Sequence, residues 1–193
     1  IYKEDYQYKN DADKSKELKV YATYRIVMRN NSALGDDGLV AKVNSIADYF
    51  DKGYVLVSTG KNLDEKGNVI EEVDHSTVEN LDNYNKVIIY NNSEVHAGQD
   101  ESIFVQLQLT PEKLVKIMDT EDATDAEREY INIAEVNSYS ITQNGKPHAG
   151  IDRISNPGNV EPGNQETYEG DTDKAPALRL EVADNARQLT GTV

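Results

Sequence analysis

Alternation of apolar and polar residues is the strongest pattern in this chain, and it predicts a β-rich fold. In residues 18–29, every second residue from Val20 to Met28 is apolar or aromatic. A period of two places successive side chains on opposite faces of a strand. The same alternation, or a short apolar run bounded by turn residues, predicts further strands at 1–9, 39–50, 54–58, 87–90, 102–109, 130–141 and 176–182.

Two helix-start signals lie between the late strands. Thr110 and Pro111 provide an N-cap and a first-turn proline, and an apolar stripe begins at Leu114. Residues 124–127 fit a capping box. We therefore expect one or two short helices inserted between the late strands.

Long polar segments separate the strands. Residues 60–83 predict an excursion with a hairpin through residues 66–68, and residues 145–176 predict a long acidic loop. No linker-like break divides the apolar segments, so we expect a single domain over residues 1–186. A chain that begins at Ile1 is expected to be a piece of a longer protein, with residues 187–193 as a linker or the first strand of a following domain.

Composition narrows the class of protein. The formal net charge of −15 disfavours nucleic acid and anionic membranes as partners, because an acidic surface repels phosphate groups. The absence of cysteine excludes disulfides, thiol catalysis and cysteine-based zinc sites. The 12 tyrosines against 2 phenylalanines are typical of half-buried sheet faces. Together with the strands, this predicts an all-β, immunoglobulin-like sandwich.

Motifs of conventional enzymes are missing from the sequence. His75, His96 and His148 each lie in a polar stretch, and their spacing does not suit a metal site. The sequence contains no nucleophile elbow, P-loop or dinucleotide-binding glycine pattern. Acidic residues are so frequent that a carboxylate pair alone has no specificity. We expect no enzyme activity beyond, at most, a reaction of the chain with itself.

The strand predicted at 130–141 places an amide among core residues. Apolar residues occur on both of its faces, which indicates a central strand. Asn132 shares its face with Ala134, Val136 and Ser138, while the other face carries Ile131, Ile133, Glu135, Asn137 and Tyr139. A buried amide without partners costs about 1–3 kcal/mol. Two interpretations stay open: Asn132 satisfies backbone groups at a strand bend, or it is consumed in a covalent bond to a lysine.

The covalent interpretation needs a lysine and an acid in the same dry core. Burial favours the neutral, nucleophilic form of the lysine amine. It also raises the pKa of a carboxyl group, which then stays protonated and polarises the amide carbonyl. Asp48 meets this test because it shares a strand face with Ile46 and Phe50. The amine is left open among three candidates, of which Lys19 lies on the outward face of its strand: Lys3, Lys9 and Lys19.

The order of these segments resembles the isopeptide-forming domains of Gram-positive fimbrial and surface adhesin proteins. The similar segments are a lysine-bearing first strand, a strand with an Asn-containing turn (20–31), a segment ending in Asp-Tyr-Phe-Asp (43–51) and an Asn-x-Ala-x-Val strand (132–136). The tail at 150–176 resembles repeats of large clostridial-type surface proteins. Residues 187–193 resemble the first strand of a collagen-adhesin B-type domain.

The resemblance implies a role for each of three residues. Lys3 would be the amine, Asp48 the catalytic acid and Asn132 the acceptor of an intramolecular isopeptide bond. It also implies an extracellular, cell-wall-anchored protein whose partners are neighbouring domains of the same chain and a host protein or glycan.

The acidic loop offers a second candidate site. Its carboxylates are the hard oxygen ligands that Ca²⁺ prefers, although the spacing is not that of an EF-hand. The predicted ligands are Asp152, Glu169, Asp171 and Asp173. A solvated acidic loop without metal is the alternative.

Two functions follow from the sequence. The first is a structural stalk or adhesin module stabilised by the Lys–Asn bond. The alternative is a ligand-binding adhesin domain without the cross-link, which a contiguous patch of exposed tyrosines or a groove would favour.

Overall fold

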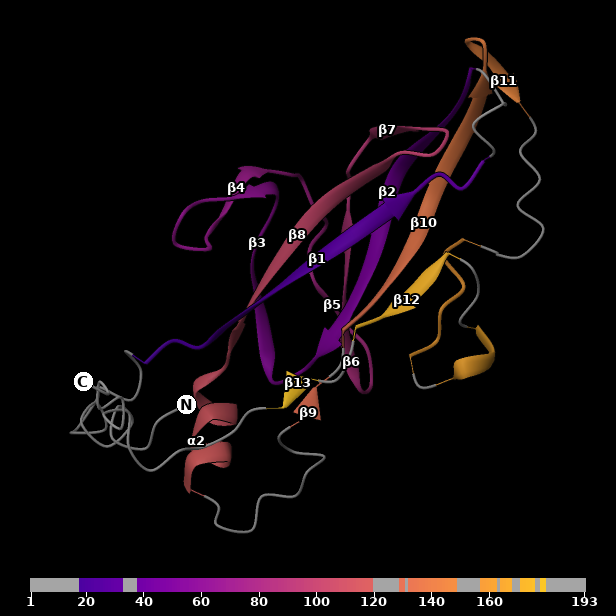
Figure 1. Cartoon of the computed structure of the whole chain (residues 1–193). Coiled ribbons are helices and arrows are strands. Elements are labelled where there is room, and N and C mark those ends of the chain that lie inside the picture. The colour runs from indigo at the N-terminus through magenta and orange to yellow at the C-terminus, as the bar shows by residue number, and fades with distance from the viewer. Residues whose placement is uncertain are drawn as a thin grey trace, which may run out of the picture.

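The computed structural model describes residues 18–32, 38–119, 129–130, 132–148, 157–162, 164–167, 171–175 and 178–179. In this part of the chain, two antiparallel sheets pack against each other, and one short α-helix, α2 (Pro111–Asp119), lies at one end (Figure 1). The predicted all-β sandwich with a short helical insertion is confirmed.

The first sheet has four strands and the second is built around a long central pair. The order in the first sheet is β1 (Tyr21–Arg29), β8 (Asp100–Leu109), β3 (Tyr54–Leu63) and β4 (Val69–Glu72). The order in the second is β11 (Lys146–His148), β10 (Asn132–Gln143), β2 (Leu39–Asp51), β6 (Tyr84–Ile89) and β5 (Glu79–Asn80). In addition, β12 (Thr172–Lys174) pairs with β10, β7 (Ser93–His96) pairs with β2, and β9 (Glu129–Tyr130) pairs with β13 (Leu178–Arg179).

The main core lies between the two sheets, where the predicted alternation holds. Ala22 and Met28 of β1 are buried, and so are Ile103, Val105 and Leu107 of β8. At the end of β8, the Lys113 N–H donates to the Thr110 hydroxyl over 3.2 Å, which confirms the predicted N-cap. The helix then packs Leu114 and Ile117 into the core.

The predicted polar excursions contain more structure than the sequence suggested. The hairpin at residues 66–68 is confirmed, and it joins β3 to β4. The segment predicted as one long loop at 145–176 contains β11, β12 and the 3₁₀ turn η2 (Gln165–Thr167), so the prediction of a loop throughout was wrong. The sequence of β12 is short and polar and shows no hydrophobic period. It is a strand because it pairs with β10.

Several predictions lie outside the described residues: the strand at 1–9, the helix start at 124–127 and the continuation at 187–193. Of the strand predicted at 176–182, only β13 is described.

A β-bulge interrupts the pairing of β2 and β10. Val136 lies opposite Ile46, but Tyr139 lies opposite Val43, and the register shifts on both sides of Ser138. Because paired residues share a face, Tyr139 lies on the same side of the sheet as the buried Val43. The prediction that Tyr139 shares a face with Ile133 was therefore wrong, since unbroken alternation cannot anticipate an inserted residue.

Candidate functional site

Asp48 lies in the middle of β2 with no exposed surface. Its neighbours on the same strand face, Ile46 and Phe50, are also fully buried and belong to the main core. Removal from water penalises the charged form of a carboxyl group, and this desolvation raises the pKa of Asp48 from 3.8 to about 7. The predicted burial of Asp48 among apolar residues is confirmed.

Asn132 lies at the start of β10 and contacts Asp48 directly. Its Nδ2 donates a hydrogen bond to Asp48 Oδ2 over 3.1 Å, and its side chain faces the main core. This bond slightly opposes the rise in the pKa of Asp48, since it favours the carboxylate. β10 pairs with β2 on one side and with β11 and β12 on the other, so the predicted central strand is confirmed.

The second oxygen of Asp48 is an orphan within the described part of the chain. Asp48 Oδ1 is buried and accepts no hydrogen bond from any described residue. A buried polar atom without a partner costs about 1–3 kcal/mol, so a native core rarely retains one without a reason. Asp48 Oδ1 could therefore accept one more hydrogen bond, beyond those that the described residues provide.

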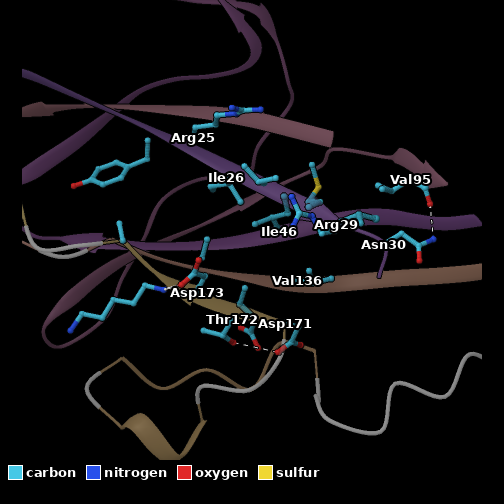
Figure 2. Close-up of a pocket in the computed structure, with 18 of the residues that line it drawn as sticks. Arg25, Ile26, Arg29, Asn30, Ile46, Val95, Val136, Asp171, Thr172 and Asp173 are labelled. Atoms are coloured by element: carbon cyan, nitrogen blue, oxygen red, sulfur yellow. Dashed lines mark hydrogen bonds between the residues drawn. The ribbon is translucent and has the colours of Figure 1, made fainter. Parts of the chain in front are cut away.

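A cavity of about 570 Å³ lies between β1 and the β10–β12 edge of the second sheet. Figure 2 shows Ile26, Ile46 and Val136 converging from both sheets to form its apolar floor. Arg25 lies at one margin, and β12 contributes the opposite one. Asn132 also lines this cavity, so the space connects the amide of the site with the margin of the sandwich.

The three candidate lysines are placed unequally. Lys3 and Lys9 lie outside the described residues. Lys19 is exposed, whereas Leu18 and Val20 on either side of it pack against the core. The outward direction predicted for Lys19 is confirmed, and this direction argues against it as the amine.

Among the described residues, Lys174 is the one lysine that lines the cavity. It lies directly opposite Ile133, whose side chain belongs to the cluster on the far face of the second sheet. Because paired residues share a face, the Lys174 side chain starts on the face opposite Asn132. It is exposed and unsuited to attack the amide.

The predicted calcium ligands are only partly described. Asp152 and Glu169 lie outside the described residues, while Asp171 and Asp173 lie at the edge formed by β12. The Thr172 hydroxyl donates to the Asp171 carboxylate over 3.3 Å, and the Lys174 N–H donates to the Asp173 carboxylate over 2.8 Å. The described residues contain no group of three or more acidic or histidine side chains close enough to hold a metal ion. Calcium binding stays a prediction.

Sequence reasoning missed a buried carboxylate on the other face of β10. Glu135 is 1% exposed, and its Oε1 accepts the backbone N–H of Asn159 over 2.7 Å and of Val160 over 3.2 Å. The Tyr49 hydroxyl donates to Glu135 Oε2 over 3.3 Å. Burial, and next the neighbouring carboxylate, raise the pKa of this hydroxyl above its ordinary value. Glu135 thus fastens the loop at 157–160 to the second sheet. A glutamate between Ala134 and Val136 was the only available signal.

Among the described tyrosines, the most exposed ones do not form a contiguous patch of the kind that ligand binding would favour. The two most exposed described tyrosines are Tyr21, on the first sheet, and Tyr90, which follows β6 of the second sheet.

No described helix has the length and apolar character needed to cross a membrane. No protein-family model matches the chain, and no curated protein resembles it closely enough to count as a match.

Proposed function

We propose that this protein is a structural module of a bacterial cell-surface protein, stabilised by an intramolecular isopeptide bond from a lysine to Asn132. The observation that carries this proposal is the buried pair of Asp48 and Asn132, joined at 3.1 Å, with one carboxylate oxygen of Asp48 that has no partner among the described residues. As a purely structural pair it costs stability, because a desolvated carboxyl group is expensive. As a reactive pair it supplies an acid and an electrophile already in contact.

The chemistry follows from the state of each group. With a pKa of about 7, Asp48 is substantially protonated at neutral pH. A protonated Asp48 donates a hydrogen bond to the Asn132 carbonyl oxygen, once the amide turns, and makes its carbon more electrophilic. The fixed positions of the reactants in a dry core replace a bimolecular encounter by an intramolecular one.

The step balances without any external reactant. The neutral lysine Nζ attacks the side-chain carbonyl carbon of Asn132, and a C–N bond forms. Asp48 takes a proton from the attacking nitrogen and delivers one to the departing NH₂ group. The original C–NH₂ bond breaks, and ammonia leaves. No atom is oxidised or reduced, and Asp48 ends in its starting protonation state.

Lys3 is the amine that the proposal assigns. It comes from the resemblance to isopeptide-forming adhesin domains, and the exposed position of Lys19 removes one rival. A bond from Lys3 to Asn132 would tie the start of the chain to a central strand. Pulling or proteolysis at the amino end could then not detach that end from the sandwich.

The cellular setting belongs to the same proposal. A module that resists force suits an extracellular, cell-wall-anchored protein, with neighbouring domains of the same chain and a host protein or glycan as partners. A chain without cysteine gains from a cross-link that needs no oxidising compartment.

The test is the intact mass of the denatured, purified chain. We expect a mass lower than the sequence mass by one ammonia. Asn132→Ala should show the mass of its own sequence. Asn137→Ala is the matched control on the same strand, because Asn137 binds Ser45 instead of Asp48, and it should keep the loss. An unmodified wild-type mass would overturn the proposal, and peptide mapping of the lighter species identifies the lysine.

A further inference from the structure

A two-residue turn, Asn144 and Gly145, joins β10 to β11. Gln143 pairs with Lys146 across this turn. Both turn residues have a positive φ, 50° for Asn144 and 74° for Gly145, which is the pattern of a type I′ hairpin. It is the one place in the sequence where glycine follows asparagine. The residues that suit this turn therefore also form a chemically reactive pair.

The reactive atoms of this pair are adjacent and open to water. An asparagine amide is attacked most readily by the backbone nitrogen of a following glycine, because glycine has no side chain to shield that nitrogen. Asn144 and Gly145 are both exposed, and a Cβ added at Gly145 would meet no atom within 4 Å. The Gly145 N–H donates to no described residue. Neither packing nor hydrogen bonding by the described residues thus protects the nucleophile.

The hairpin that contains the turn is easy to open. β11 has three residues, all exposed, and its middle residue is Pro147, which lacks an N–H. Figure 1 shows β11 at the end of the long strand β10, away from α2. Short, exposed pieces of sheet open at a low free energy. Opening matters because the attack requires the peptide group after Asn144 to rotate out of its turn conformation.

We propose that Asn144 is a site of spontaneous deamidation, reached when the β10–β11 turn opens, with water as the co-reactant. The Gly145 nitrogen attacks the side-chain carbonyl carbon of Asn144, a C–N bond forms, and the C–NH₂ bond breaks. The proton of the Gly145 nitrogen leaves with the NH₂ group as ammonia, and a succinimide remains. Water then opens either C–N bond of the ring to give aspartate or isoaspartate. No atom is oxidised or reduced.

The modification changes the end of the second sheet. The Asn144 N–H donates to the Gly38 carbonyl over 2.9 Å, and the Asn144 side-chain oxygen occupies the space that a Cβ at Gly38 would need. Aspartate places a negative charge there. Isoaspartate lengthens the backbone of a turn that is built for two residues. The second product therefore loosens β11 and the contact with Gly38, just before β2.

This inference does not depend on the proposed cross-link. Asn132 is the first residue of β10, and Asn144 directly follows the last. Asn132 would lose ammonia to a lysine and leave the chain lighter, whereas Asn144 takes up water and ends with the mass of an aspartate. Intact mass and peptide mapping separate the two, so either proposal can fail alone.

The test is peptide mapping of the folded full chain during incubation at mildly alkaline pH. Asn92 is the matched internal control, because it is exposed and also has a φ of 50°, but it is followed by the buried Ser93. We expect Asn144 to convert at least about tenfold faster than Asn92, with isoaspartate among the products. Asn144→Gln, whose longer side chain closes a ring far more slowly, should abolish this conversion.

Three results would overturn the proposal. The first is equal conversion at Asn144 and Asn92. The second is conversion of Asn144 to aspartate without isoaspartate, which would indicate direct hydrolysis of the amide. The third concerns the opening of the turn: urea below the unfolding midpoint should speed conversion at Asn144, and a rate that urea leaves unchanged would show that no opening is needed.

Discussion

Asp48 and Asn132 lie diagonally across the β2–β10 ladder: Asp48 pairs with Ala134, and Asn132 pairs with Phe50. Diagonal neighbours on one sheet face are within reach of each other's side chains. Their 84-residue separation in sequence means that this contact exists only after β10 has paired with β2. The proposed chemistry thus depends on the fold.

Asp48→Asn keeps the shape of the side chain but removes the acid. We expect the cross-linking rate to fall by roughly 10²–10⁴-fold, the usual contribution of a positioned acid–base group. Freshly purified protein should then have the unmodified mass. Asp51→Asn, at the end of the same strand, is the control and should react fully. Complete ammonia loss in Asp48→Asn would show that Asp48 is not the acid.

Stability of the uncross-linked chain should fall with rising pH because of Asp48. Its pKa is about 7 in the folded chain and 3.8 in its ordinary state, so the folded chain retains the proton while the unfolded chain loses it. The contribution is complete below about pH 4 and is lost as pH rises through about 7, at a cost on the order of a few kcal/mol.

Lys3→Ala supplies a chain that cannot cross-link through Lys3 and still keeps Asp48 and Asn132. Its free energy of unfolding, measured by urea denaturation between pH 4 and 8, is compared with that of Lys3→Ala combined with Asp48→Asn. The difference between the two curves of unfolding free energy against pH cancels the contributions of the other titrating groups. Parallel pH curves would rule out a raised pKa at Asp48.

Glu135→Ala should loosen the loop at 157–160 without affecting the cross-link. The substitution leaves the N–H groups of Asn159 and Val160 without their acceptor, at a cost of about 1–3 kcal/mol for the buried Val160 group and less for the partly buried Asn159 group. Faster proteolysis within 157–162 and a lower urea midpoint are expected. Glu161→Ala, which removes an exposed side chain, should change stability by less than about 0.5 kcal/mol. Equal proteolysis of both variants would contradict the fastening role.

Gly60→Ala should destabilise the hairpin of β3 and β4. A Cβ at Gly60 would collide with the backbone carbonyl of Ile70 and the side chain of Val69, and overpacking of this kind typically costs about 1–3 kcal/mol. Gly67→Ala meets no atom but has a φ of +80°, so its cost is conformational, about 1 kcal/mol. Thermal denaturation of both variants should rank Gly60→Ala as the less stable. The opposite ranking would show that the β3–β4 contact yields without cost.

The sequence predicted the inward direction of Asp48 and Asn132 because strand alternation is a local property. It could not predict that the two side chains touch, since their contact depends on the register of strands far apart in the chain. Glu135 shows the same limit: its place in a central strand was readable, but its partners Asn159 and Val160 come from a loop without a period. β12 was missed because tertiary pairing, and not propensity, makes Thr172–Lys174 a strand.

The bulge at Ser138 divides the β2–β10 ladder into two reading frames. On one side of the bulge, Ile46 and Val136 face the core. On the other side, Val43 faces the core, although strict alternation from Ile46 would turn Val43 to the opposite face. Asp48 and Asn132 both belong to the first frame. A substitution in this region changes one side chain, but a one-residue insertion or deletion between Ile46 and Asp48 would turn Asp48 to the face of Glu135. Lineages of this domain that keep the site should therefore tolerate replacements along these strands far better than changes in their length.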